Sequence, residues 1–225
     1  MNTNIWTRPE DVIISQQAMP GMDDPRSTSL DETHQTDLGN AERLARRHGL
    51  NLRFASDLNR FFVWDGQRWR ADDTGIVMTW AKDTVRAISS EAADAPRGMG
   101  DEIRDHALRS ESKRALEAMI ELVKTEPGIP LRKEELDADP WLLNCKNGTL
   151  ELRTGTLRDA DRNDLITKLV PVNYDPKAQC PAFLAFLGRV MDGHDEMIAY
   201  LRRATGYALT GDTSEEVFFF LYGTG

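Results

Sequence analysis

The stretch Phe61-Phe62-Val63-Trp64-Asp65-Gly66-Gln67-Arg68-Trp69-Arg70 decides how the first half of this chain folds. Runs of aromatic and β-branched residues, which are typical of strands, flank Asp65-Gly66. An Asp-Gly pair supplies the positive φ angles that a two-residue hairpin turn requires. The stretch therefore predicts a β-hairpin with strands over residues 61–64 and 67–70.

This hairpin has two functional interpretations. It could bind nucleic acid, with bases stacked on its rings and phosphates held by its arginines. Alternatively, the rings face a core and the arginines face water, as in any half-buried strand pair. We favour the second interpretation. The residues concerned are Phe61, Phe62, Trp64, Trp69, Arg60, Arg68 and Arg70.

Two further arginine pairs raise the same question. Arg46-Arg47 and Arg202-Arg203 could line a DNA channel. Solvated helix faces carry such pairs more often, and we favour that interpretation.

Helical patterns lie on both sides of the hairpin. Before it, Asp37 can cap a helix that ends near Gly49. After it, Asp73 or Thr74 can begin a long helix, and a further helix precedes Pro127. The apolar stripes of the three helices are Leu38, Ala41, Leu44 and Ala45; Val77, Trp80, Ala81, Thr84 and Ile88; and Leu116, Met119, Ile120 and Val123.

The second half of the chain begins with another hairpin pattern. Strands over residues 141–145 and 149–152 flank Asn147-Gly148, and residues 166–174 predict one more strand. Two helices follow, with apolar stripes at Phe183, Phe186, Leu187 and Val190, and at Met197, Ile198, Leu201, Ala204, Thr205 and Ala208. Together these elements predict an α+β fold that is mainly helical with small antiparallel hairpins.

The apolar run over residues 217–222 is followed by Gly223-Thr224-Gly225. A buried strand that ends in a glycine-rich turn is how a phosphate-binding loop begins. In the full loop, G-x-x-x-x-G-K-[ST], backbone N–H groups cradle the phosphates, and the lysine and hydroxyl bind the outer phosphates and Mg²⁺. We predict that Gly223, Thr224 and Gly225 belong to such a nucleotide-binding loop. Alone they lack its lysine and metal-binding hydroxyl, so we expect this chain to bind ATP negligibly.

The composition excludes several classes of protein. A hydrophobic content of 40% and a charged content of 29% are ordinary for a soluble globular domain. No apolar run approaches the ~20 residues that span a bilayer. Cys145 and Cys180 are too few for a disulfide framework. We find no nucleophile, general base or metal-ligand set, and we expect a cytoplasmic protein without a membrane partner.

The charge is unevenly distributed. The net charge of −9 argues against a general nucleic-acid-binding face. Residues 1–37 hold seven acidic side chains against two arginines. Proline, glycine and serine interrupt any periodicity over residues 1–36, which we expect to be a disordered N-terminal tail.

Several segments are diagnostic as a group. They are Glu126-Pro127-Gly128-Ile129-Pro130, Leu136-Asp137-Ala138-Asp139-Pro140-Trp141-Leu142-Leu143-Asn144, Asn147-Gly148-Thr149-Leu150-Glu151-Leu152-Arg153-Thr154-Gly155, Asp164-Leu165-Ile166-Thr167-Lys168, Tyr174-Asp175-Pro176, Cys180-Pro181, Gly206-Tyr207 and Leu209-Thr210-Gly211-Asp212. As a group they closely resemble the phage and plasmid primase–helicases, relatives of the poxvirus primase–helicase. The similarity extends from about residue 37 to residue 225.

The resemblance implies a domain order. Residues 37–178 correspond to the linker domain, which in that family follows an N-terminal priming module. Residues 179–225 correspond to the start of a superfamily 3 helicase, an α/β AAA+ (P-loop) ATPase. The family's loop reads G-x-G-x-N-G-K-S, so Gly223 and Gly225 align with its first two glycines. The family's loop lysine, hydroxyl, acidic Mg²⁺ residues and arginine finger have no counterpart in this sequence, which we expect to stop inside the loop.

The resemblance also implies an activity for the parent protein. It hydrolyses ATP with Mg²⁺ as a ring-shaped homo-oligomer, usually a hexamer, and unwinds DNA during replication. Its partners are then DNA, other copies of itself, and a primase module or replication proteins. Its location is the cytoplasm of a bacterial host, encoded by a phage, prophage or plasmid. The alternative is a non-enzymatic adaptor over residues 37–174 that binds DNA or another replication protein.

Overall fold

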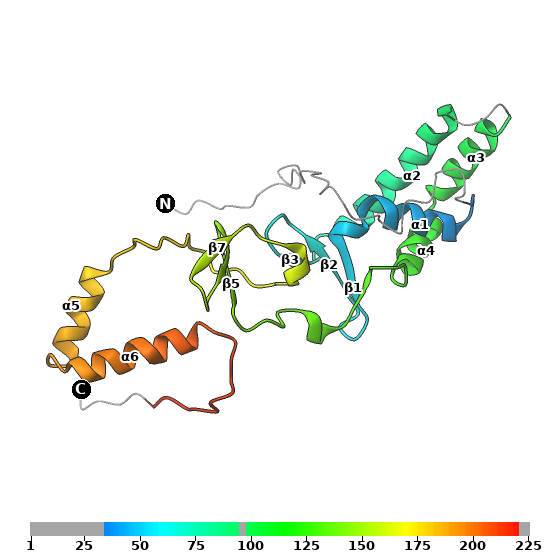
Figure 1. The fold of residues 1–225 in the computed structure, drawn as a ribbon. Coiled ribbons are helices and arrows are strands. Elements are labelled where there is room, and N and C mark those ends of the chain that lie inside the picture. The colour runs from blue at the N-terminus through cyan, green and yellow to red at the C-terminus, as the bar shows by residue number, and fades with distance from the viewer. Residues whose placement is uncertain (1–33, 95–97, 221–225) are drawn as a thin grey trace, which may run out of the picture. The chain divides into compact units, whose positions relative to one another are not determined.

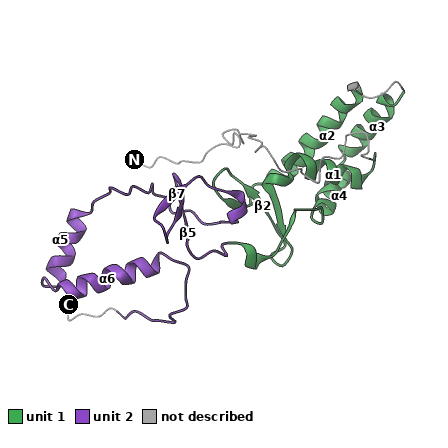
Figure 2. Ribbon diagram, viewed as in Figure 1, with its two compact units in different colours: residues 1–136 green, residues 137–225 purple. Residues whose placement is uncertain are grey.

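The computed structural model describes residues 34–94 and 98–220 (Figure 1). The chain divides into two compact units, residues 1–136 and residues 137–225 (Figure 2). Each unit combines helices with a small sheet, so the predicted α+β class is confirmed. The elements of unit 1 are α1 (Asp37–His48), β1 (Leu52–Ala55), β2 (Arg60–Trp64), β3 (Trp69–Ala71), α2 (Ile76–Asp94), α3 (Gly100–Ser110), α4 (Lys113–Val123) and β4 (Pro130–Leu131), with 3₁₀ turns at Gly49–Asn51 and Lys133–Glu135.

The sheet of unit 1 has the strand order β3-β2-β1-β4. β1, β2 and β3 are antiparallel neighbours, and β4 pairs with β1 in parallel. One face of this sheet packs against α1, α2 and α4. The buried core between them consists of Ala41, Leu44, Ala45, Leu52, Phe54, Val63, Val77, Trp80, Ala81, Val85, Leu116, Met119, Val123 and Ile129. The predicted stripes of the three helices supply most of these residues.

The predicted hairpin exists, but its turn is longer than expected. Trp64 pairs with Trp69, so residues 65–68 form the loop and the second strand begins at Trp69. The reason is the carboxylate of Asp65, whose Oδ1 accepts hydrogen bonds from the N–H groups of Gln67 (2.9 Å) and Arg68 (2.8 Å). Asp65 N also donates to Arg68 O at 3.1 Å, so these two residues still face each other across Gly66-Gln67, although the strand ladder ends at Trp64 and Trp69.

Both helix starts differ slightly from the expected ones. Thr36, not Asp37, caps α1, because its Oγ1 accepts a hydrogen bond from Gly39 N at 3.1 Å. At α2 the capping carboxylate belongs to Asp72, not to Asp73 or Thr74. Asp72 accepts from the N–H groups of Ile76 (2.8 Å) and Val77 (2.9 Å). In each case the first polar side chain able to reach the free N–H groups makes the cap.

α3 lies outside the main core of unit 1. It runs beside α2 in Figure 1, and the two helices share a separate small cluster of Ile88, Ala92, Ile103 and Ala107. α3 is therefore fastened to the unit by a smaller apolar contact than α1, α2 or α4.

Unit 2 begins with a three-stranded antiparallel sheet in the order β5-β6-β7. Its elements are β5 (Leu142–Cys145), β6 (Gly148–Glu151), β7 (Thr156–Arg158), α5 (Pro181–Val190) and α6 (Asp195–Ala208), with a 3₁₀ turn at Arg162–Asp164. The second predicted hairpin is thus confirmed, with its turn at Lys146-Asn147 and Gly148 already in the strand. Gly148 has φ 137°, and a Cβ there would collide with the carbonyl oxygen of Arg158, so this position requires glycine.

The predicted strand over residues 166–174 is wrong. This segment forms a single bridge, in which Val170 pairs with Cys145. Val170 N donates to Asn144 O (2.8 Å) and Lys146 N donates to Val172 O (2.9 Å). Pro171 lies between the two contacts and has no N–H, so a regular ladder cannot continue through it.

The two predicted helices after Pro181 are confirmed as α5 and α6. Their apolar residues, however, are largely exposed. Within the two predicted stripes, Leu187 is buried and the other side chains are exposed or half-buried. The exposed apolar side chains of these helices include Phe183, Leu184, Phe186, Val190, Met197 and Tyr200.

Candidate functional site

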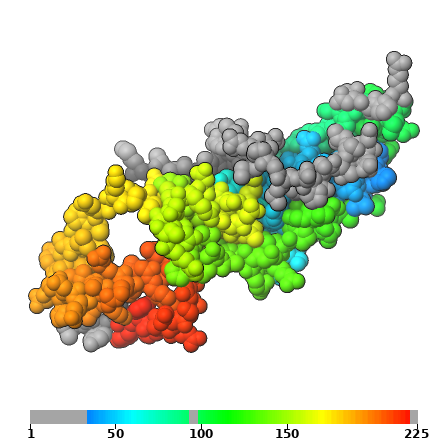
Figure 3. Space-filling model, viewed as in Figure 1, coloured from blue at the N-terminus to red at the C-terminus, as the bar shows by residue number. Residues whose placement is uncertain are grey.

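The predicted phosphate-loop residues Gly223, Thr224 and Gly225 lie outside the described residues. Of the apolar run that precedes them, residues 217–220 are described, and they form neither strand nor helix. Phe218 is 85% exposed, and the red surface in Figure 3 includes this segment. A fully apolar strand is stable when neighbouring strands cover it. None of the strands in the described ranges pairs with residues 217–220, so the predicted strand is not formed over them.

Most of the residues that carry the family resemblance lie in unit 2, and the first of these is Asp137. Its Oδ1 accepts from Thr167 N (2.8 Å), its Oδ2 accepts from Thr167 Oγ1 (2.6 Å), and its own N–H donates to Leu165 O (3.1 Å). Asp137 has φ 53°, a conformation that aspartate tolerates better than most residues. The aspartate thus fastens the start of unit 2 to the segment after β7.

Two asparagines extend this fastening. Asn144 Nδ2 donates to Lys168 O at 3.1 Å. Asn147 makes two bonds with the backbone of Tyr174: its Nδ2 donates to the carbonyl oxygen and its Oδ1 accepts from the N–H, both at 2.9 Å. We name Asp137, Asn144, Asn147 and Thr167 the polar clasp. Because the clasp residues bind backbone groups of segment 165–174 or one another, they act as structural fasteners.

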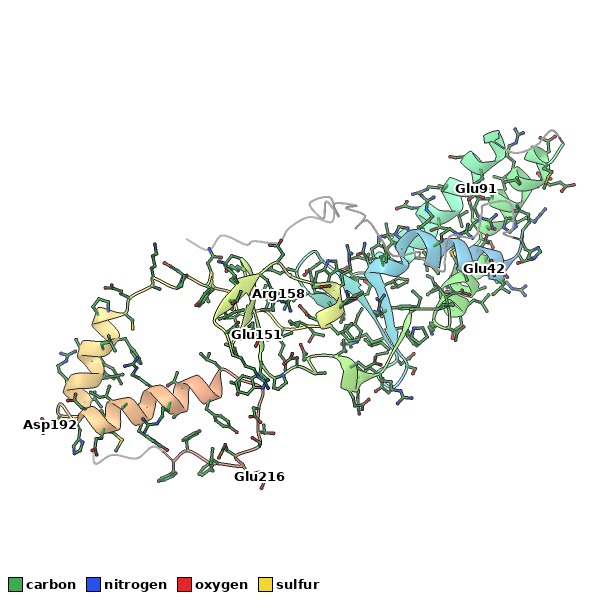
Figure 4. All side chains as sticks on the ribbon, viewed as in Figure 1. Glu42, Glu91, Glu151, Arg158, Asp192 and Glu216 are labelled. Atoms are coloured by element: carbon green, nitrogen blue, oxygen red, sulfur yellow. The ribbon has the colours of Figure 1, made fainter. Side chains whose placement is uncertain are left out.

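An ion pair joins β7 to the 3₁₀ turn that follows it. Arg158 on β7 makes two parallel bonds to Asp164, of 2.8 and 2.7 Å. The hydrogen bonds that Arg158 donates to Asp164 raise the pKa of the Arg158 guanidinium, with smaller contributions from the charges of Asp164, Asp161 and Glu151. Figure 4 shows Arg158 and Glu151 at this sheet. Such a two-pronged pair holds a fixed geometry, so Arg158 is committed to Asp164.

Residues just after α6 contact residues just before β5. Gly211 N donates to Pro140 O at 2.8 Å. The guanidinium of Arg153 lies 4.6 Å from the ring centroid of Trp141, the residue that follows Pro140. Asp212 accepts hydrogen bonds from Ser214, and these lower the pKa of its carboxyl group, with a further contribution from Arg153. Two segments of the resemblance that are about 70 residues apart are therefore adjacent in space.

Unit 1 contains a buried polar cluster that sequence reasoning missed. His106 Nε2 lies 2.9 Å from Asn40 Oδ1 and 3.3 Å from Ser110 Oγ, and Asn40 Nδ2 donates to Ser110 Oγ at 2.9 Å. The spacing of His106 and Ser110, one helical turn apart, could have indicated their contact. No local signal indicates Asn40, which comes from another helix.

This cluster resembles a catalytic arrangement but cannot act as one. A serine nucleophile needs one imidazole nitrogen as its base and the other held by an orienting group. Here Asn40 and Ser110 share the same nitrogen of His106. All three side chains are also buried, so a substrate has no access to the hydroxyl.

The aromatic hairpin does not form a stacking platform for bases. Phe62, Trp64 and Trp69 are buried, whereas Arg60 and Arg70 are exposed. The preferred interpretation, rings inside and arginines outside, is therefore confirmed for these residues. Arg202 and Arg203 are exposed on α6, as expected of a solvated helix face.

The described residues offer little other chemistry. Within residues 34–94 and 98–220, no group of three or more His, Cys, Asp or Glu side chains could hold a metal ion. Cys145 is buried and burial raises the pKa of its thiol, which makes it a poor nucleophile. A hollow of about 220 Å³ beside α2 is lined by Lys82, Val85, Arg86, Glu111 and Leu116. Glu111 adds a negative charge to this lining and Arg86 pairs with Asp83 at 3.0 Å, so the hollow lacks a dominant charge.

Among the helices of the described ranges, none combines the length and the apolar character that crossing a bilayer demands.

A family model described as "D5 N terminal like" matches residues 41–192. The match begins in α1 and ends just after α5, so it includes the core of unit 1, the sheet of unit 2 and the polar clasp. No curated protein matches the sequence.

Proposed function

This chain belongs to the D5 N-terminal-like family of D5-type primase–helicases, and we propose that it is the part of such a replication protein that connects to an ATP-driven DNA helicase. The observation that carries this proposal is the family match over residues 41–192, which covers elements of both compact units. The role is a scaffold: the described residues offer fasteners and no catalytic set, as the polar clasp and the His106 cluster illustrate.

The exposed helices of unit 2 support a connecting role. α5 and α6 expose Phe183, Phe186, Val190, Met197 and Tyr200, and residues 217–220 expose three phenylalanines. Isolated exposed apolar residues are ordinary, but contiguous ones mark surfaces that other protein covers. In the proposed parent protein, the remainder of a superfamily 3 ATPase domain covers these residues and adds strands beside residues 217–222.

The proposed nucleotide chemistry uses Gly223, Thr224 and Gly225 as the opening of the phosphate loop. These residues fit the group only in part. Their backbone N–H groups can approach a phosphate, but the lysine that meets the outer phosphates and the hydroxyl that ligates Mg²⁺ are not among them. When bound, Mg²⁺-ATP supplies the phosphoryl group whose transfer drives unwinding. This chain's own contribution is then ring assembly or domain spacing, with DNA, other copies and a primase module or replication proteins as partners.

The coding DNA beyond Gly225 provides the first test. An open reading frame that continues with a glycine-lysine-hydroxyl sequence within the next few codons supports the proposal, and its product should hydrolyse ATP in the presence of Mg²⁺. A frame that continues without any lysine placed to meet a triphosphate contradicts it.

Calorimetry with this chain gives the second test. We expect no measurable heat of binding when Mg²⁺-ATP is added up to millimolar concentration, because the loop's charge and metal contact are missing. A dissociation constant in the micromolar range would show that these residues form a nucleotide site by themselves.

The adaptor alternative needs its own measurement. Filter binding of single-stranded DNA at 50 and 200 mM salt separates the two functions, since binding through phosphate contacts weakens steeply with salt. Salt-sensitive binding by a chain that binds no ATP favours an adaptor that holds DNA.

A further inference from the structure

α3 is attached to unit 1 through an apolar contact with α2 and a polar contact with α1. Its apolar residues Ile103 and Ala107 contact α2 through the small cluster with Ile88 and Ala92, apart from the main core. Its attachment to α1 is polar and consists of His106 and Ser110 bonded to Asn40. Segments with few buried apolar contacts open at lower free energy than the rest of a domain.

The proton positions in this attachment follow from the geometry. Asn40 Oδ1 is an amide oxygen and can only accept, so His106 Nε2, at 2.9 Å, carries a proton in the neutral ring. Ser110 Oγ accepts from Asn40 Nδ2 at 2.9 Å. The second proton of an imidazolium must therefore go to Nδ1. Among the residues that the structure describes, Nδ1 has no hydrogen-bond partner.

The surroundings of His106 disfavour an imidazolium. Its side chain is buried, with 5% exposed. Burial lowers the pKa of His106, and the positive charges of Arg43 on α1 and Arg109 on α3 lower it further. Asp37 on α1 and Glu91 on α2 act in the opposite direction. Glu91 raises the pKa of His106 only partly, because its charge is paired with Arg43: Glu91 Oε2 lies 3.1 Å from Arg43 Nε. Figure 4 labels Glu91 on α2.

We propose that Asn40, His106 and Ser110 form an acid-released latch that holds α3 against α1. At neutral pH the uncharged ring closes the latch. In acid, a charged ring is more stable in water than beside Arg43, so α3 detaches locally while the main core stays folded. This inference rests on unit 1 alone and is independent of the proposed helicase function.

The sign and size of the effect follow from linkage. A histidine whose pKa is lower in the closed state than in the open state stabilises the closed state above the ordinary histidine pKa of about 6.5. That stabilisation is lost as pH falls below this value toward the pKa of the closed state. If the closed ring stays neutral, the opening equilibrium constant rises about tenfold between pH 7.5 and pH 5.5.

Hydrogen exchange followed by mass spectrometry on the full chain tests the latch. We expect exchange in peptides from α3, corrected for the intrinsic effect of pH, to rise about tenfold from pH 7.5 to pH 5.5. Peptides from α4, which packs in the main core, should change much less. The variant His106→Gln, which is neutral at both pH values, should lose the pH dependence of α3.

A matched control is His48→Gln. His48 is the other histidine with a lowered pKa, but it lies at the end of α1 and stacks on Trp80, so this variant should keep the pH dependence of α3. The latch is overturned if exchange in α3 is unchanged between the two pH values, or rises equally in His106→Gln. If His106→Gln fails to fold, an NMR titration of the His106 ring in the natural chain decides: a pKa at or above 6.5 overturns the proposal, and a lower one supports it.

Discussion

Gly211 donates its backbone N–H to the carbonyl oxygen of Pro140 at 2.8 Å, which joins the residues after α6 to the entrance of β5. A Cβ at residue 211 would lie 3.1 Å from Pro140 Cα and 3.3 Å from Pro140 Cβ. Such distances are tighter than ordinary van der Waals contact, so the bond depends on the absence of a side chain at residue 211.

Replacing Gly211 with valine should loosen this junction. The added methyl groups push Gly211 away from Pro140, and we expect a loss of about 1–3 kcal/mol in the opening free energy of α6, measured by hydrogen exchange. Gly206→Ala is the matched control. Residue 206 lies inside α6 with open space around it, so alanine there should stabilise the helix by about 0.5–1 kcal/mol. Equal destabilisation by both variants contradicts the junction.

The contribution of the polar clasp to stability should be measurable as a coupling free energy between Asp137 and Thr167. Asp137→Ala leaves the N–H and hydroxyl of Thr167 without their acceptor, so we expect unit 2 to lose about 1–3 kcal/mol in urea unfolding. In a double-mutant cycle with Thr167→Val, the two losses should not add. Lys168→Ala serves as the control. The Lys168 side chain is 84% exposed and its Nζ lies 4.0 Å from Asp137 Oδ2, so the variant should change stability by less than about 0.5 kcal/mol.

Acid should weaken unit 1 through His48. Burial lowers the pKa of His48 to about 4, with a smaller contribution from Arg47 and an opposing one from Asp83. The ring stacks on Trp80, with centroids 4.7 Å apart. Because the folded pKa lies below the unfolded value of about 6.5, the stabilisation is complete above pH 6.5 and is lost as pH falls toward 4.

The measurement is urea unfolding between pH 7.5 and pH 4.5, followed by tryptophan fluorescence. His48→Gln should show a smaller fall in stability over this range than the natural chain, because one of the titrating groups is gone. If the two proteins lose stability in parallel, His48 is not the group that responds.

The exposed phenylalanines after α6 should limit solubility. Val217, Phe218 and Phe220 are 52%, 85% and 72% exposed, and apolar segments of this kind associate with one another. We expect a chain that ends at Glu216 to remain soluble at a higher concentration than the full chain, as judged by light scattering. Equal scattering of the two chains at matched concentration would count against this.

Local signals in the sequence predicted most of the fold. The helical stripes located α1, α2, α4, α5 and α6, and the Asp-Gly and Asn-Gly pairs located the two hairpins. The predicted ends of these elements were wrong where a side chain takes the place of a backbone hydrogen-bond acceptor. Asp65 does so in the first loop, and Asp72 does so before α2. A turn dipeptide indicates that a chain reverses, but the hydrogen bonds of its own side chains decide where the strand resumes.

The missed features depend on residues distant in the sequence. β1 and β4 are short, and each is a strand because of its neighbours in the sheet. The bond between Asn40 and Ser110 joins two helices 70 residues apart. Alternation predicted that the hairpin rings are buried. It could not be predicted that the apolar stripes of α5 and α6 are exposed, because periodicity indicates which face of a helix is apolar and not whether anything covers that face.

The pairing of β4 with β1 also determines when unit 1 can finish folding. Ala55 pairs with Leu131, and the N–H of Phe54 donates to Ile129 O, so the last edge of the sheet comes from a segment that is made after α1, α2, α3 and α4. As the chain leaves the ribosome, β1, β2 and β3 can assemble early from near neighbours. The sheet then waits for a distant strand, and closing so long a loop is slow compared with forming a hairpin. Until then the unpaired edge of β1 can pair with another extended segment, so the nascent chain is open to mispairing at this stage.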